Sequence, residues 1–334
     1  MTERTKAFFI NGGAGRVLCS IPALEKYAEE VDKNFIVVCE GGTDFYRGHP
    51  ILHSRCYDHW HKNLFEDKLI NCDLITPEPY RVWEYFNQKC SIAQAYDIAI
   101  NNKGIRNLQQ PFLKLSNDES ILGFNIVKEV KEKTGKKKVV VVQPFGRGVK
   151  ADNNIIYDPS GRSFEGVHVI EIVKKLQKED IAVIVMSELG IDFQKHGCKD
   201  PVALPQNVSL RQWAGIIGQA DYFLGCDSVG QHLAVALNKP LSVVLGSTFP
   251  INVTYMDYDK LDILDMGGTV RQYSPIRITM DDVADRGNDG IMKMNDKIEN
   301  TIVESVKKGM EKFPMDQSTT DEISVTSAPT CPTC

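Results

Sequence analysis

The chain has 334 residues, of which 42% are hydrophobic and 25% charged, a composition typical of a folded globular protein rather than a disordered one. This length fits two domains of ordinary size, and no apolar run reaches the ~18 residues that a membrane span needs. The net charge of -5 gives no electrostatic footprint for nucleic acid, and the N-terminus lacks the apolar segment of a signal peptide, so we expect a cytoplasmic protein.

The first part of the chain predicts a βαβ unit, the building block of a parallel sheet. The run KAFFI (6–10) has the pattern of a buried strand and ends in the turn residues NGGAG. Apolar residues then recur at helical spacing over 17–31, and NFIVVCEGG (34–42) predicts a second buried strand. Residues 45–100 show no clear period, so we expect mostly long loops and short helices there.

The rest of the chain predicts a regular alternation of strands and helices. DIAIN (97–101) is interpreted as a strand, and the amphipathic segment 119–135, which closes at Gly135, as a helix that joins the two halves. Beyond it we expect strands at 136–143, 181–188, 221–226 and 241–246, and helices at 168–179, 209–220, 231–238 and 291–312. This order predicts an α/β protein with doubly wound parallel sheets.

The stretch CDSVGQHLAVALNKPLSVVLGST (226–248) places polar residues between two buried elements. Asp227, Ser228, Gly230 and His232 lie where a strand ends and a helix begins, and open α/β sheets bind ligands at that end of their strands. A helix start offers unpaired N–H groups and a positive dipole end, which suit a phosphate. The same residues can instead cap and pack the helix, and both interpretations stay open.

The strand that follows ends in a second group of small polar residues, Gly246, Ser247 and Thr248. Hydroxyl groups at two successive strand ends can bind a diphosphate from two sides. The whole segment 209–250 resembles the signature of glycosyltransferase family 9, the ADP-heptose:lipopolysaccharide heptosyltransferase group, whose pattern contains D-S-G-P-x-H and then G-x-T-x-P. GGAGRVLCSIPALEKY (12–27) is similar to the G-x-G-D-x-x-x-x-x-P-a-l motif of that family.

The resemblance implies a GT-B architecture, in which two Rossmann-like domains face each other across a cleft. It implies an acceptor domain over 1–135, a donor domain over 136–280, a helix over 281–313 that crosses back, and a flexible tail over 314–334. It also implies an inverting glycosyltransferase that moves a sugar from an ADP- or UDP-linked donor to a carbohydrate or other hydroxyl acceptor. Neither a metal nor another cofactor is expected.

The residues that we expect at the donor diphosphate lie in or beside the matching motifs. They are Gly13, Gly15, Arg147, Arg162, Asp227, Ser228, Gly230, His232, Gly246, Ser247 and Thr248. Arg147 and Arg162 lie in the middle segment, QPFGRG and GRSFEGVHVIEIVKKLQ, which resembles that of the family less closely, and both are equally well interpreted as solvated arginines.

The catalytic base is the main departure from the family pattern. The family carries an aspartate where this chain has Arg16. In the D-S-G-P-x-H motif, the glycine is displaced by one position, to Gly230. A base must remove the proton of the acceptor hydroxyl, which arginine cannot do at neutral pH. Arg16 can instead stabilise a negative leaving group or bind an anionic acceptor. Asp44 and Asp97 are the alternative candidates for the base.

Two other functions stay open. One is a glycosyltransferase that modifies a nucleobase in DNA, against which the acidic composition counts because duplex binding depends on phosphate contacts. The other is a protein that binds a nucleotide sugar without transferring it, which Arg16 in the aspartate position favours. The pair Cys331 and Cys334 is interpreted as two incidental thiols in the tail, because no second such pair exists in the chain.

Overall fold

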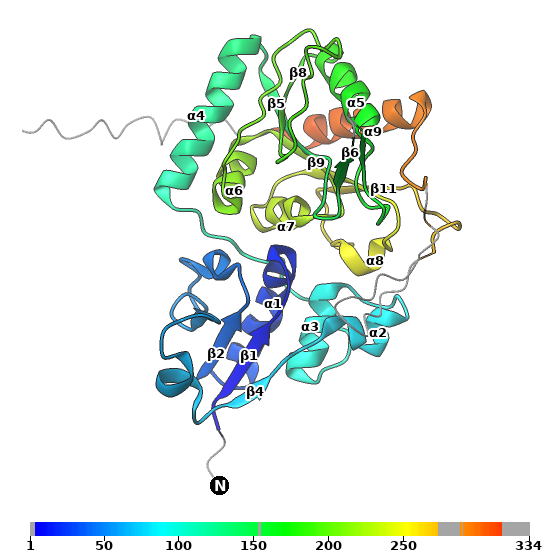
Figure 1. The fold of residues 1–334 in the computed structure, drawn as a ribbon. Helices are drawn as coiled ribbons and strands as arrows, with labels where there is room; N and C mark the ends of the chain where they lie inside the picture. Colours follow the sequence, from blue (N-terminus) through cyan, green and yellow to red (C-terminus); the bar gives the residue numbers. More distant parts are fainter. Residues whose placement is uncertain (1–3, 153–154, 273–287, 289, 316–334) are drawn as a thin grey trace, which may run out of the picture.

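The computed structural model describes residues 4–152, 155–272, 288 and 290–315, and Cys331 and Cys334 lie outside this part. Two α/β domains, each with a parallel sheet, lie one above the other (Figure 1). Within the described residues, no helix is both long enough and apolar enough to cross a membrane.

The N-terminal domain has a four-stranded parallel sheet in the order β3-β2-β1-β4. Its strands are β1 (Lys6–Ile10), β2 (Phe35–Cys39), β3 (Cys56–Asp58) and β4 (Asp73–Ile75). Its helices are α1 (Ala14–Glu30), α2 (Trp83–Phe86) and α3 (Ile92–Asn101), with short helical turns η1 (Thr43–Tyr46), η2 (Phe65–Leu69) and η3 (Pro79–Arg81). The strand order reverses between β1 and β4, which makes the ends of these two strands the topological switch point.

The C-terminal domain has a five-stranded parallel sheet in the order β11-β10-β9-β5-β8. Its strands are β5 (Lys138–Gln143), β8 (Ile181–Val185), β9 (Tyr222–Cys226), β10 (Leu241–Leu245) and β11 (Leu261–Asp265), with a separate antiparallel hairpin of β6 (Lys150–Asp152) and β7 (Ile155–Tyr157). Its helices are α4 (Asn117–Thr134), α5 (Gly166–Lys178), α6 (Leu210–Gln219), α7 (Val229–Ala236), α8 (Pro250–Val253) and α9 (Asp296–Lys312). Here the order reverses between β5 and β9.

The segment DIAIN, predicted as a strand, is the second half of helix α3. Ser91 and Gln94 form a capping box at the start of this helix, each binding the backbone N–H of the other. Ala93, Tyr96 and Ile100 are buried at helical spacing, so one face of the segment packs against α1. The helix begins at Ile92, five residues before the apolar run 97–101. Considered without that helix start, the run is short and apolar enough to resemble a strand.

Two predicted domain limits differ from the packing. The helix α4 was expected in the first domain, but it packs against α6, β5 and β8 of the second. The helix α9 was expected to cross back to the first domain, but it packs against α5, β9, β10 and β11. Figure 1 shows it within the C-terminal domain. Its apolar residues Ile302, Val303 and Val306 are buried in the core of the C-terminal domain. Both helices therefore belong to that domain.

The two domains are joined by polar contacts as well as by the chain. Asn252, fully buried on α8, donates its side-chain amide to the carbonyl oxygens of Tyr85 and Cys90, both at 3.0 Å. Arg211 on α6 donates to the carbonyl oxygen of Asp44 at 3.3 Å. Helices α1 and α7 also pack against each other, which brings the two switch points together (Figure 1).

Candidate functional site

The candidate site lies where the start of α1 meets the start of α7. Gly15 and His232, predicted from separate motifs, are in contact there across the two domains. A Cβ atom at Gly15 would lie 3.0 Å from Cδ2 of His232, tighter than an ordinary contact, so this approach depends on glycine. Gly13, at the start of α1, has open space where a Cβ atom would lie.

His232 is a buried, neutral residue whose Nδ1 atom contacts two protonated groups. Nδ1 lies 2.8 Å from the hydroxyl of Tyr255 and 3.5 Å from Sγ of Cys19. Burial raises the pKa of Cys19 to about 12, so this group stays a thiol at neutral pH. Burial lowers the pKa of His232 to about 4, although the Asp227 carboxylate acts in the opposite direction. When Nδ1 accepts a hydrogen bond, the proton lies on Nε2, which can donate to a ligand.

This buried histidine predicts a pH dependence of stability. The unfolded chain binds a proton at His232 below pH 6.5, whereas the folded chain resists protonation down to about pH 4. The free energy of unfolding therefore falls as the pH falls, by roughly 2 kcal/mol from this residue between pH 6.5 and pH 5. Urea unfolding at both pH values should show a smaller decrease for His232→Gln than for wild type. The exposed His196→Gln variant should behave as wild type, and equal decreases in all three proteins would contradict the expectation.

At the start of α7, one backbone N–H group is bound by a protein side chain and two others are, within the described part of the chain, free to bind a ligand. The Oε1 atom of Gln143, at the end of β5, accepts from the N–H of Gly230 at 2.7 Å. Ser228 is the N-cap residue, but its side chain caps no N–H and instead accepts from Gln143 Nε2 at 3.2 Å. Among the hydrogen bonds of the described residues, none engages the N–H of Val229 or Gln231. These two N–H groups can bind an anion.

The absence of a side chain at Gly230 is explained by the packing of the protein itself. A Cβ atom there would overlap both Oε1 of Gln143 and the ring of Phe223. The glycine thus makes room for a side chain of the protein rather than for a ligand. Gln143 links the two strands of the switch point, and sequence reasoning missed it because a single glutamine after an apolar run carries no recognisable pattern.

The residues after β10 hold a neighbouring loop. A Cβ atom at Gly246 would overlap the carbonyl oxygen of Gly161, and the Ser247 hydroxyl donates to the carbonyl oxygen of Ser160 at 2.6 Å. The hydroxyl of Thr248, a residue only 2% exposed, has no hydrogen-bond partner within the described residues. Gly246 and Ser247 therefore support the loop that carries Arg162. The Thr248 hydroxyl is available for a hydrogen bond to a ligand.

Arg162 is the positively charged residue beside the start of α7. Its guanidinium group lies 3.6 Å from Oδ2 of Asp227, and its side chain is 27% exposed. Burial opposes the charge, but the nearby groups, Asp227 foremost among them, together raise the pKa of Arg162 above its ordinary value. Asp227 also accepts from Gln231 Nε2 at 3.1 Å and does not cap the helix. Arg147 is exposed and makes no ion pair with any residue that the structure describes.

The N-terminal switch point carries a second cluster of charged and aromatic groups. Arg16 donates from Nε to the hydroxyl of Tyr96 at 2.9 Å and from its terminal nitrogen to both carboxylate oxygens of Glu78 at 3.3 Å. Its guanidinium carbon lies 5.0 Å from the ring centre of Tyr80. Arg16 is thus bound to protein groups at the end of β4. Sequence reasoning missed Glu78, since the short strand before it has no clear pattern.

The two carboxylates predicted as alternative bases are held elsewhere. The side chain of Asp44 is 61% exposed and pairs with Arg47 of the same turn. Asp97 is buried in α3, where it accepts from Arg106 at 2.5 and 2.8 Å and from Asn101 at 2.7 Å. Neither carboxylate is brought to the contact between α1 and α7.

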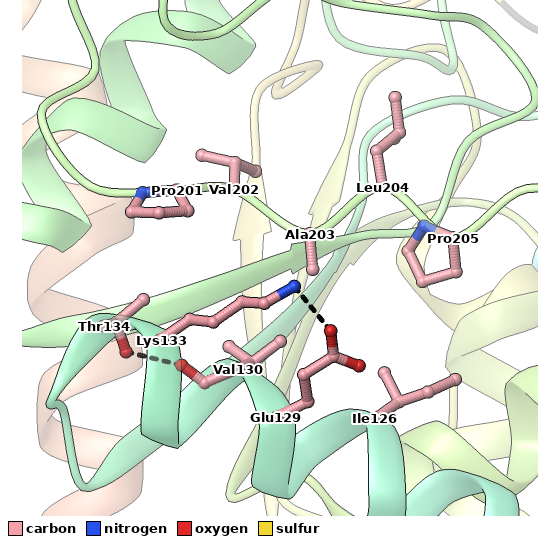
Figure 2. Close-up of a pocket in the computed structure, with 10 residues that line it drawn as sticks. All are labelled: Ile126, Glu129, Val130, Lys133, Thr134, Pro201, Val202, Ala203, Leu204 and Pro205. Atoms are coloured by element: carbon pink, nitrogen blue, oxygen red, sulfur yellow. Dashed lines mark hydrogen bonds and ion pairs between the residues drawn. The ribbon is translucent and has the colours of Figure 1, made fainter.

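A pocket of about 330 Å³ lies away from this site, between α4 and residues 201–205 (Figure 2). Apolar side chains such as Ile126 and Leu204 line most of it, and the Glu129–Lys133 ion pair lies along one side. It contains none of the motif residues, and we assign no chemistry to it.

Two Rossmann-like domains with facing switch points define the GT-B fold, and solved structures support this assignment. A glycosyl transferase family 9 protein from Veillonella parvula has a TM-score of 0.64 at 10% identity, over 92% of this chain and 98% of its own. The Escherichia coli heptosyltransferase WaaC, solved with ADP, has a TM-score of 0.52 at 12% identity, over 91% of this chain and 99% of its own.

A third similar structure is the dodecameric iron-containing glycosyltransferase TibC from enterotoxigenic E. coli, with a TM-score of 0.58 at 12% identity. It matches over 92% of this chain and 77% of its own. No protein-family model and no curated protein matches the chain. The predicted GT-B architecture is confirmed, and the predicted resemblance to glycosyltransferase family 9 is confirmed at the level of the fold.

Proposed function

We propose that this protein is an inverting glycosyltransferase that moves a sugar from a nucleoside diphosphate sugar to a hydroxyl acceptor. The observation that carries the proposal is the meeting of two switch points, with the start of α7 and Arg162 on one side and the start of α1 on the other. Open α/β sheets bind their ligands at such points. A ligand between them contacts both domains at once.

The donor side suits a diphosphate. The N–H groups of Val229 and Gln231 lie at the positive end of the α7 dipole, and Arg162 adds a full positive charge beside them. Cleavage of the bond between the sugar and the diphosphate leaves negative charge on the leaving oxygen, which these groups stabilise in place. Neutral His232 contributes a hydrogen bond without repelling Arg162. We also propose that this transfer needs no metal ion.

Nucleotide binding tests the donor site. ADP or UDP at about 100 times its dissociation constant should raise the free energy of unfolding by about 2.7 kcal/mol, seen as a higher melting temperature. AMP or UMP, which lacks the second phosphate, should raise it less at the same concentration. Release of ADP or UDP from ADP-heptose, ADP-glucose or UDP-glucose then reports turnover, with water as the acceptor.

The other outcomes separate the alternatives. If no nucleotide or nucleotide sugar changes the melting temperature, the donor site is wrong. Tight binding of a donor that is never cleaved identifies a nucleotide-sugar binding protein. A salt-sensitive complex with duplex DNA, formed beside donor cleavage, favours a nucleobase acceptor.

A further inference from the structure

The proposed transfer needs a base, and the residue at the family's aspartate position is Arg16. The structure places a carboxylate directly beside that arginine. Glu78 follows β4, the strand next to β1, so its carboxylate and the start of α1 lie at one switch point. The carboxylate nearest to Arg16 in this cluster thus comes from the segment after the neighbouring strand and not from the helix.

The Glu78 side chain is held in a defined position. Both its oxygens accept from Arg16 at 3.3 Å, and Oε1 also accepts from the N–H of Tyr80 at 3.2 Å. Arg16 is fixed in turn by the Tyr96 hydroxyl and by the Tyr80 ring. The Glu78 side chain nevertheless stays 31% exposed. It is therefore oriented, and it is accessible to an acceptor.

The start of α1 also connects Glu78 with the donor side. Gly15 directly precedes Arg16 in α1, and a Cβ atom at Gly15 would lie 3.0 Å from Cδ2 of His232 in α7. Arg16, which binds the Glu78 carboxylate, is therefore one residue away from the contact between α1 and α7.

Other carboxylates near the strand ends are less suitable. Asp227 is paired with Arg162 and belongs to the diphosphate side. Glu40 follows β2, on the side of β1 away from β4, and within the described part of the chain it accepts only a 3.4 Å hydrogen bond from the N–H of Gly12. Asp44 and Asp97 are held by Arg47 and Arg106 respectively.

We propose that Glu78 is the general base of this transfer and that Arg16 positions it, an inference that rests on the proposed function. The acceptor oxygen forms a bond to the anomeric carbon while the bond between that carbon and the diphosphate oxygen breaks. The leaving nucleoside diphosphate takes the electron pair, and the proton of the acceptor hydroxyl goes to the Glu78 carboxylate. Solvent removes this proton before the next turnover.

The test compares Glu78→Gln with Glu40→Gln in the full chain. Glutamine keeps one carbonyl oxygen, which can accept from both Arg16 and Tyr80 as Oε1 does, but it cannot take the proton. We expect Glu78→Gln to lower kcat for nucleoside diphosphate release in water by about 10²–10⁴-fold, with ADP affinity within threefold of wild type. Glu40→Gln should match wild type in both measurements.

Azide separates proton removal from a structural role, because this anion attacks the anomeric carbon without losing a proton. With azide as acceptor, Glu78→Gln should form the glycosyl azide at the wild-type rate, measured by mass spectrometry. Loss of azide transfer together with water transfer would overturn the assignment, as would wild-type kcat in Glu78→Gln. A wild-type protein that cleaves none of the donors would instead overturn the proposed function itself.

Discussion

Replacing Arg162 with alanine is expected to weaken ADP binding by about 1.5–3 kcal/mol, or roughly 10- to 150-fold. The guanidinium group is the charged donor beside the start of α7, and hydrogen bonds to charged groups contribute more than neutral ones. Its loss also leaves the Asp227 carboxylate without its cation, next to the phosphates that it then repels. Calorimetric titration with ADP measures both effects together.

Arg147→Ala is the matched control, because this arginine lies in the neighbouring loop but is exposed. It should change ADP affinity less than twofold. Arg162→Lys keeps the charge without the planar fork and should bind ADP with intermediate affinity. If Arg162→Ala binds ADP as wild type does while its melting temperature is unchanged, the diphosphate does not lie beside Arg162.

Most of the fold follows from local patterns in the chain. Strands β8, β9 and β10 of the C-terminal sheet are almost entirely apolar, and each is fully buried, because a parallel sheet is covered on both faces. The three-residue strands β3 and β4 are too short to show a period, and they pair only because β1 and β2 offer a template. β11 was missed because it lies at the sheet edge, where two of its five residues are aspartates and none is fully buried.

Sequence motifs predict those parts of the candidate site whose residues are adjacent in the chain. Asp227, Ser228 and His232 fall at the start of α7 as expected, since a strand end and a helix start are adjacent in the chain. Glu78 and Gln143 required the three-dimensional arrangement, because each acts on a residue from another strand end. A sequence motif identifies the residues of one turn. The order of the strands in the sheet is needed to show which turns lie next to each other.

Replacing Gly215 with alanine is expected to destabilise the protein by about 3 kcal/mol or more. Helices α4 and α6 pack so closely that a Cβ atom at Gly215 would overlap the carbonyl oxygen of Glu119, and one at Gly123 would overlap that of Gly215. Backbone atoms on both sides cannot move without separating the helices. The buried ion pair of Glu119 and Arg211, at 2.6 Å, would be stretched as well.

Gly218→Ala on the same helix is the control, since its Cβ atom would meet only side-chain atoms, Cδ1 of Leu115 at 3.3 Å and Cδ1 of Leu237 at 3.9 Å, and only the first contact is tight. That side chain can shift, and alanine favours the helix by about 1 kcal/mol over glycine, so stability should change little or increase. Urea unfolding of both variants separates the two cases. Helix α4 directly follows the segment that links the two domains, and Arg211 on α6 also binds the carbonyl oxygen of Asp44 in the first domain. A separation of α4 from α6 would therefore also move the domains apart. Gly215→Ala with wild-type stability would mean that α4 is not seated against α6.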